Sequence, residues 1–306
     1  MKRKLVSIAQ RSYFVSLPID WIRSHGLKKG DEVHVDSRDG TVLISIDELT
    51  HGRKASVDVR GLNHRIINYV LACFYKQGFD EIELTYEGKE TYMHVNKEVN
   101  EVLLGFTVSS KTKDRINLKL VAKCSEKEFN TSLRRAFLSA VDLGEESLKA
   151  IKKGKIDKLQ ELLILERDNT KLTNFCELVL SRSDFKNSNF LFSICSILEK
   201  IADSYKYINT FLMKHDEKLS KNTLKSFDMT NDFLRGYYNL HYKFSMKTLN
   251  DLEKVRSKLI QSYDKCLEGN YSDRIVAGFL KDTALRIMDL TVPILVVHSP
   301  RMLKTK

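Results

Sequence analysis

Basic side chains in the first thirty residues could bind the phosphates of a nucleic acid. Residues 1–30 hold seven Lys or Arg and one acidic residue, a net charge of +6, whereas residues 31–50 hold one Arg and six acidic residues, a net charge of −5. Lys and Arg release counterions when they contact phosphates, and this release supplies most of the sequence-independent affinity for DNA. From the charge alone, a solvated basic N-terminus that binds no nucleic acid is the favoured alternative.

The side chains that we predict to contact double-stranded DNA lie around the first polar turn and in the helix that follows it. The predicted contacts are Lys2, Arg3, Lys4, Arg11, Ser12, Tyr13 and Arg23, with Arg3, Lys4, Arg11 and Ser12 as the first candidates. The larger apolar side chains of the same segment, Leu17, Trp21 and Val33, are expected to pack in its core.

Paired carboxylates in the second half of the chain could ligate a metal ion. Glu199 and Asp203 are four residues apart, so a helix places both on one face, within reach of one cation. Glu166 and Asp168 could approach the same cation from the preceding helix. The alternative, which we favour, is that these acids pair with neighbouring Lys or Arg side chains or lie over a groove between helices.

Other classes of chemistry find no support in the sequence. It contains no nucleophile elbow, no phosphate-binding loop, and no HExxH or DxD motif. The five cysteines are scattered without a CxxC pair, so we expect reduced thiols in the core. The longest apolar stretch, Leu290–Val297, is far shorter than the roughly 20 residues that span a bilayer. We therefore expect a cytoplasmic protein that is not an enzyme and does not insert into a membrane.

The elements that must position these residues fall into three segments. With 306 residues, 42% of them hydrophobic and only 3 Pro, the chain can form two or three folded domains and is not of a disordered or collagen-like class. We predict a multidomain α+β fold with domains at residues 1–50, 51–125 and 126–300, followed by a basic tail at 301–306.

The first segment reads as short strands around one small helix. Apolar residues predict strands near residues 5–8 and 13–17, and Pro18 begins a two-turn helix that Gly26 ends. Asp39-Gly40 predicts a hairpin between two further strands. Because so small a segment buries little surface by itself, we expect it to need a partner.

The second and third segments differ in periodicity. Residues 53–124 read as an α+β module with two helices and strands near 82–86, 106–110 and 116–121. From residue 126 onward the apolar residues recur at helical spacing. The predicted helices span residues 130–153, 155–182, 188–213, 217–243, 246–268 and 271–297.

An internal repeat relates two of these helices. Glu199-Lys200-Ile201-Ala202-Asp203 aligns with Leu285-Arg286-Ile287-Met288-Asp289 at an offset of 86 residues, which covers three helices and their loops. The repeat predicts two tandem three-helix bundles packed side by side.

The first segment resembles the AbrB/MazE/SpoVT swapped-hairpin domain. The resemblance rests on Arg11-Ser12-Tyr13-Phe14-Val15-Ser16-Leu17-Pro18, on Trp21, and on Gly26-Leu27-Lys28-Lys29-Gly30-Asp31-Glu32-Val33. It covers nearly all of residues 1–46. It implies a small domain-swapped dimeric β-barrel, and therefore a homodimer, that binds DNA through basic residues near the first strand and the loop after it.

The helical segment resembles the PhoU domain, whose three-helix unit occurs twice and carries acidic motifs. Leu198-Glu199-Lys200-Ile201-Ala202-Asp203 matches the motif of its third helix, whereas Thr170 and Leu285 stand where acids are usual. The resemblance implies a site for a divalent metal or iron at Glu166, Asp168, Glu199, Asp203 and Asp289. With the first segment, the chain looks like the archaeal fused regulators of phosphate uptake.

These resemblances imply a dimeric DNA-binding transcriptional regulator of phosphate uptake, whose PhoU-like bundle senses phosphate status or docks a signalling partner. The alternative is an adaptor that inhibits a phosphate ABC transporter by binding its ATPase subunit, without binding DNA. A third possibility, disfavoured by the long helical segment, is an antitoxin-like module that neutralises a basic or nuclease partner.

Overall fold

The computed structural model describes residues 2–8, 12–38, 41–46, 52–183, 185–215 and 217–299. The chain divides into two compact units, residues 1–51 (unit 1) and 52–306 (unit 2), and each is described by itself. The predicted mixed α+β class, with a small N-terminal β domain and a helical C-terminal part, is confirmed. The closed barrel, the tandem three-helix bundles and the three-domain boundaries stay predictions.

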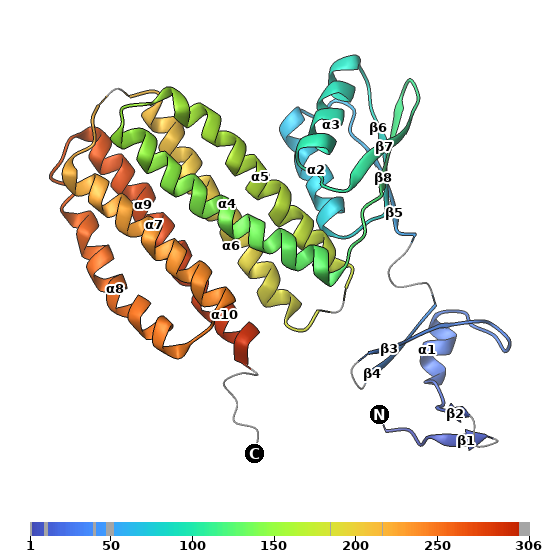
Figure 1. The fold of residues 1–306 in the computed structure, drawn as a ribbon. Helices are drawn as coiled ribbons and strands as arrows, with labels where there is room; N and C mark the ends of the chain where they lie inside the picture. The colour runs from blue at the N-terminus through green and yellow to red at the C-terminus, as the bar shows by residue number, and fades with distance from the viewer. Residues whose placement is uncertain are drawn as a thin grey trace. The chain divides into compact units, whose positions relative to one another are not determined.

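The described residues of unit 1 form two antiparallel pairs of strands and one short helix (Figure 1). Its elements are β1 (Val6–Ile8), β2 (Ser12–Phe14), α1 (Ile19–Ser24), β3 (His34–Arg38) and β4 (Thr41–Ser45). β1 pairs with β2, and β3 pairs with β4. Pro18 precedes the first turn of α1 with φ −61°, and Gly26 follows the helix at φ +67°, a left-handed conformation that favours glycine.

The first part of unit 2 is an α+β module, defined here as residues 52–124. Its elements are β5 (Lys54–Asp58), α2 (His64–Lys76), β6 (Glu81–Thr85), α3 (Lys89–Glu101), β7 (Phe106–Lys111) and β8 (Arg115–Leu120). The sheet has the order β5-β6-β8-β7, with β5 parallel to β6 and the other pairs antiparallel. α2 and α3 lie on one face of the sheet (Figure 1). Strand β5 was not predicted, because only Ala55 and Val57 turn partly inward.

The remainder of unit 2, called the helical part here, spans residues 126–299. Its helices are α4 (Glu126–Lys152), α5 (Asp157–Ser181), α6 (Ser188–Leu212), α7 (Lys221–Tyr242), α8 (Met246–Asp264), α9 (Tyr271–Asp289) and α10 (Thr291–His298). The sixth predicted helix, residues 271–297, is thus interrupted at Leu290. The physical reason is Pro293, which has no N–H to donate to the carbonyl of Asp289 four residues earlier.

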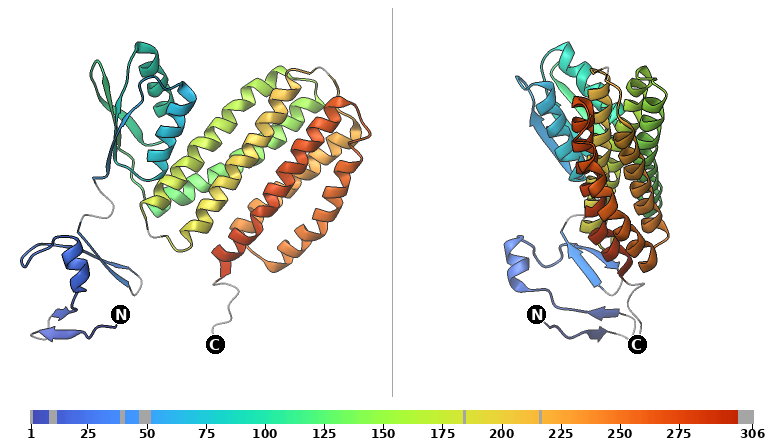
Figure 2. Two further views of the ribbon diagram at one scale, coloured as in Figure 1. Left: turned by 180° about the vertical axis from the view of Figure 1, so that it is seen from behind. Right: turned by 90° about the vertical axis from the view of Figure 1, so that its left-hand side faces the viewer.

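The long helices pack side by side around one continuous core. α5 and α6 lie against each other, α6 also packs against α9, and α4 packs against α7 (Figures 1 and 2). Gly144 allows α4 to approach its neighbours closely, because a Cβ there would lie 2.6 Å from Asn231 Oδ1 and 2.7 Å from Tyr205 Cζ. Within the described ranges, no helix is long and apolar enough to cross a membrane.

Candidate nucleic-acid interface

The predicted DNA contacts of unit 1 lie on and before the first hairpin. Lys2, Arg3 and Lys4 directly precede β1 and are exposed, and the ring of Tyr13 on β2 is 72% exposed. Ser12 begins β2, opposite Ile8. Arg11 lies outside the residues that the structure describes.

Arg23 reaches solvent from a different element, the last turn of α1. Arg23 and the three cations before β1 form no ion pair with any carboxylate that the structure describes. Their charges are therefore available to an external anion, which is what phosphate contacts require. The predicted core residues Leu17, Trp21 and Val33 are half-buried in the single chain.

Unit 1 has no closed core within one chain. None of its described side chains is buried, and α1 buries none of its residues. The exposed large apolar side chains are Leu5, Val6, Tyr13, Phe14, Val15, Ile19, Val35, Val42 and Leu43. Full burial of such a side chain stabilises a fold by about 1.5–3 kcal/mol. Covering this apolar surface would therefore stabilise unit 1.

The hairpin register orders part of that surface. Val6 pairs with Phe14, and Ser7 pairs with Tyr13, so alternate pairs lie on opposite faces of the two strands. Val6 and Phe14, 56% and 52% exposed, form an apolar pair on one face. Tyr13 lies on the opposite face, so the hairpin can use one face for packing and the other for polar contacts.

The acidic residues predicted as metal ligands do not all meet at one point in unit 2. Glu166 on α5 and Asp203 on α6 meet at the ammonium of Lys206, whose Nζ lies 2.8 Å from Glu166 Oε1 and 2.5 Å from Asp203 Oδ1. Asp168 and Asp289 are exposed and outside this cluster. In the part of the chain that the structure describes, no group of three or more His, Cys, Asp or Glu side chains could hold one metal ion. Metal binding here stays a prediction, and Lys206 is the cation that a metal would have to displace.

The Lys206 cluster is electrostatically well satisfied. Burial by itself lowers the pKa of Lys206, but hydrogen bonds to Asp203 and Glu166 outweigh it and raise the pKa to about 12. A second lysine, Lys200, lies farther from Asp203, at 3.6 Å, and is half exposed. Lys206 is therefore the main counterion of the two carboxylates.

Glu199, the remaining predicted ligand, belongs to a contact between the α+β module and the helical part. Lys76 on α2 lies 3.6 Å from Glu199 Oε2 and 2.8 Å from Glu177 Oε2. Glu177 is almost fully buried, and this burial raises the pKa of its carboxyl although Lys76 acts in the opposite direction. A buried carboxyl with one lysine partner makes this contact sensitive to loss of Lys76.

A second ionic contact joins the same two parts of unit 2. The Arg182 guanidinium donates hydrogen bonds to Gly78 O and to Asp80 Oδ1, each at 2.7 Å, and its side chain is only 7% exposed. Sequence reasoning did not find Lys76, Glu177, Arg182 or Asp80. Their partners are about 100 residues apart along the chain, and no local pattern signals such a pairing.

One comparison with known proteins gives a match. Residues 8–47 match a family described as "Antidote-toxin recognition MazE, bacterial antitoxin". No curated protein and no solved structure matches the chain. The chain thus carries a MazE/AbrB-like domain at its N-terminus, as its sequence predicts, and this domain is consistent with DNA binding and dimerisation.

Proposed function

We propose that this chain is a homodimeric DNA-binding transcriptional regulator and not an enzyme. The observation that carries the proposal is the group of unpaired cations leading into the first hairpin of a MazE/AbrB-like domain. Two copies of unit 1 would cover the apolar surface that one copy leaves exposed, and would join two basic segments into one DNA-binding face.

The helical part supplies the regulatory half of the proposal. Its long helices and its acidic motif at Glu199 and Asp203 are compatible with a PhoU-like bundle, and we propose on that resemblance that it responds to phosphate status or docks a signalling partner. A signal acts on DNA binding if it changes the separation or orientation of the two basic faces, because the spacing of half-sites is set by the dimer.

The salt dependence of DNA binding tests the proposal. We would measure mobility shifts over a range of salt for the wild type and for the triple variant Arg3→Ala, Lys4→Ala, Arg11→Ala, using promoter DNA of phosphate-transport genes. A dimer of the variant lacks six cations, so the slope of log K against log salt becomes shallower by about 5 if all six contact phosphates. An unaltered affinity and slope would refute the proposal.

A matched control removes the same charge elsewhere. The lysines 221, 225 and 247 are exposed on α7 and α8 and form no ion pair with a described residue. Their replacement by Ala leaves the slope unchanged if unit 1 makes the DNA contacts. An equal change of slope in this control would show that total charge, and not the hairpin, binds DNA.

Two other functions make different predictions for partners. The match to an antitoxin family favours a toxin-binding module, which requires a toxin to compete with DNA for unit 1. The PhoU resemblance alone favours an adaptor that inhibits a phosphate ABC transporter through its ATPase subunit. Co-purification with that subunit, and no competition by DNA, would favour the adaptor over the regulator.

A further inference from the structure

A cavity of about 410 Å³ lies at one end of the helical part, between the turn from α4 to α5 and the loop from α6 to α7. We call it the end cavity. Its walls include Ile151 and Ile156 from the α4–α5 side, and Leu212, Leu219 and Leu224 from the other side. These side chains pack against the hydrophobic core and give the cavity an apolar side, while the rest of its surface is polar. Its volume suits a small organic molecule.

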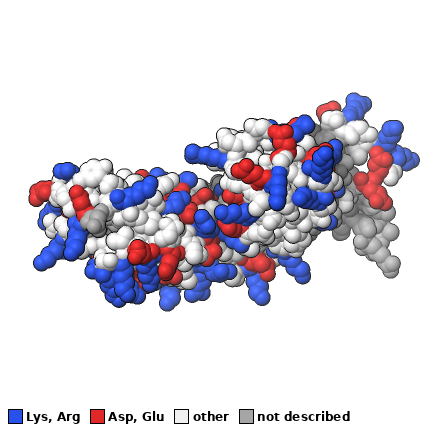
Figure 3. Space-filling model, turned by 90° about the horizontal axis from the view of Figure 1, so that it is seen from above, with Lys and Arg blue, Asp and Glu red and all other residues white. Residues whose placement is uncertain are grey.

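The rim of the end cavity is cationic. Lys152, Lys153 and Lys218 line it, and neither Lys153 nor Lys218 forms an ion pair with a described carboxylate. Lys152 lies 3.4 Å from Asp228 Oδ2, in a pair exposed to solvent. Lys and Arg side chains gather on this end of the helical part, with some acids beside them (Figure 3).

The acid at the rim is engaged elsewhere. Among the lining residues that the structure describes, Glu217 is the one carboxylate, and its Oε2 accepts a hydrogen bond of 3.0 Å from the backbone N–H of Ser272. Glu217 thus satisfies the first turn of α9. It keeps its negative charge, but this hydrogen bond directs it to a helix N-terminus, and it forms no ion pair with a described rim lysine.

α5 begins beside the cavity, directly after its N-cap residue Ile156, which is one of the lining residues. The N–H groups of Lys158 and Leu159 in this first turn donate to the backbone carbonyls of Lys155 and Ile156, and Asp157 places a carboxylate in the same turn. The positive charge at the cavity therefore comes from the rim lysines, and the cavity combines these lysines with apolar wall residues.

A neighbouring hollow offers a comparison. It measures about 380 Å³ and shares Lys152 and Lys153 with the end cavity. Among its described lining residues, two carboxylates, Glu145 and Asp228, accompany Lys149, Lys152 and Lys153, whereas in the end cavity one carboxylate, Glu217, accompanies Lys152, Lys153 and Lys218.

We propose that the end cavity binds a small amphipathic anion, meaning a carboxylate or phosphate-ester group on an apolar body. The anionic group would lie between Lys153 and Lys218, and the apolar body would lie against the leucine and isoleucine walls. Inorganic phosphate alone leaves those walls uncovered, so it binds much more weakly. This site is separate from the DNA-binding unit and does not depend on the proposed regulatory function.

Calorimetry on the full chain, without DNA, tests the proposal with four probes: octanoate, phenyl phosphate, inorganic phosphate and octanol. Binding of octanoate or phenyl phosphate supports it, and the tighter of the two identifies the preferred anionic group. Absence of binding by both overturns it. Equal binding of octanol overturns the role of the lysines, and equal binding of inorganic phosphate overturns the role of the apolar walls.

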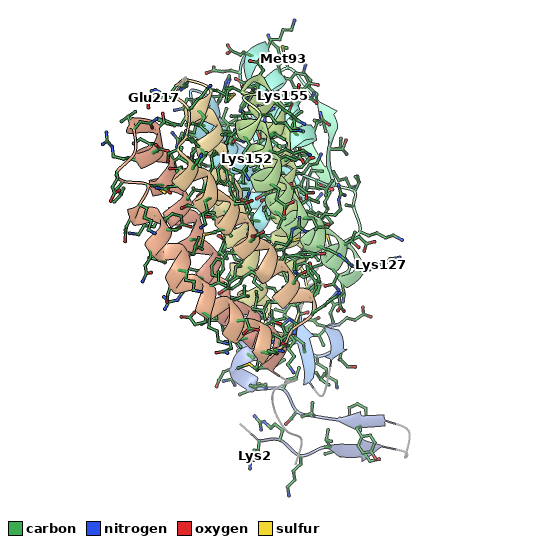
Figure 4. All side chains as sticks on the ribbon, turned by 60° about the vertical axis from the view of Figure 1, so that its left-hand side comes forward. Lys2, Met93, Lys127, Lys152, Lys155 and Glu217 are labelled. Carbon is green, nitrogen blue, oxygen red and sulfur yellow. The ribbon has the colours of Figure 1, made fainter. Side chains whose placement is uncertain are left out.

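Variants locate the bound anion. The double variant Lys153→Met, Lys218→Met changes two exposed side chains, so it should fold, and we expect its Kd to rise at least tenfold for each lysine lost. Lys127→Met is the control, because Lys127 is an exposed lysine at the start of α4. The cavity-lining residues Lys152 and Glu217 lie toward the other end of the helical part (Figure 4).

Filling the cavity provides an independent check. Leu219→Trp places a larger side chain in the cavity and should abolish binding while Lys127→Met leaves it unchanged. Unchanged affinity in the double lysine variant, or equal weakening in Lys127→Met, overturns the proposal. DNA affinity measured on the same variants stays at the wild-type value, so failure here and failure of the regulator proposal are distinguishable.

Discussion

Replacing Lys206 with Met removes the ammonium that Glu166 and Asp203 share. The side chain of Lys206 is 29% exposed, and those of its partners are 11% and 18% exposed. The rise in the lysine pKa from 10.5 to about 12 corresponds to about 2 kcal/mol of stabilisation, at 1.36 kcal/mol per pKa unit. We therefore expect Lys206→Met to lower the free energy of unfolding at pH 7 by about 2 kcal/mol.

The pH dependence of this effect has a definite sign. Because the pKa of Lys206 is higher in the folded than in the unfolded chain, its stabilisation is fully present below about pH 10.5 and is lost as the pH rises through about 12. Urea denaturation of unit 2 at pH 7 and pH 9 should give the same difference between variant and wild type.

Lys200→Met is the matched control. Lys200 lies on the same helix and also approaches Asp203, but at 3.6 Å and with half of its side chain exposed. Exposed pairs of this kind contribute less than about 1 kcal/mol. If the two variants lose equal stability, the shared ammonium of Lys206 is not the counterion that holds α5 to α6, and the reasoning is wrong.

The Lys206→Met variant also tests the predicted metal site. Without Lys206, the two carboxylates lose their shared cation, and only Lys200, 3.6 Å from Asp203 and half exposed, remains beside them among the ion pairs of the described residues. Mg²⁺ or Mn²⁺ should then raise the Tm of Lys206→Met while leaving that of the wild type unchanged. An equal rise in both proteins would show that a metal binds without displacing the lysine.

Three further perturbations follow from single contacts. Burial lowers the pKa of His241 to about 4, so stability should fall by up to about 3 kcal/mol as the pH drops from 6.5 to 4, and His241→Gln should flatten this part of a denaturation profile. Arg182→Met leaves Asp80 without its cation, so hydrogen exchange of the α+β module should become faster, with no change at the far end of α8. Gly144→Ala should lower the free energy of unfolding by about 1–3 kcal/mol, because its Cβ meets neighbouring side chains. Gly278→Ala has open space around it in α9 and should raise that free energy by up to about 1 kcal/mol. Equal Tm values for the two variants would contradict the packing argument.

Sequence periodicity predicted most of the helical part because each long helix repeats its apolar stripe over several turns. It failed where the signal was short or conflicting. Two partly buried residues, Ala55 and Val57, are too few to mark β5 as a strand. The apolar pattern runs on through Leu290, although Pro293 interrupts the backbone hydrogen bonds there.

The contacts of the site residues differ in how far apart the two partners lie along the sequence. Lys206 lies three residues after Asp203, so their pairing could be read from helical spacing. The pairing of Arg182 with Asp80, about 100 residues earlier, depends on how the α+β module packs and leaves no mark in local sequence. The lysines of the α4–α5 turn can be read from the sequence. That the loop from α6 to α7 faces them across the end cavity cannot.

The chain's net charge of +11 does not by itself indicate where anions bind. Lys76 and Lys206 are cations already held by buried or half-buried carboxylates, so they add to the total and offer little to a partner. The unpaired cations before β1 and around the end cavity remain available to an anionic partner. Because DNA binding would involve several exposed phosphate contacts, added salt should weaken it steeply. Binding in the end cavity should respond less, since its apolar walls contribute affinity that salt does not screen.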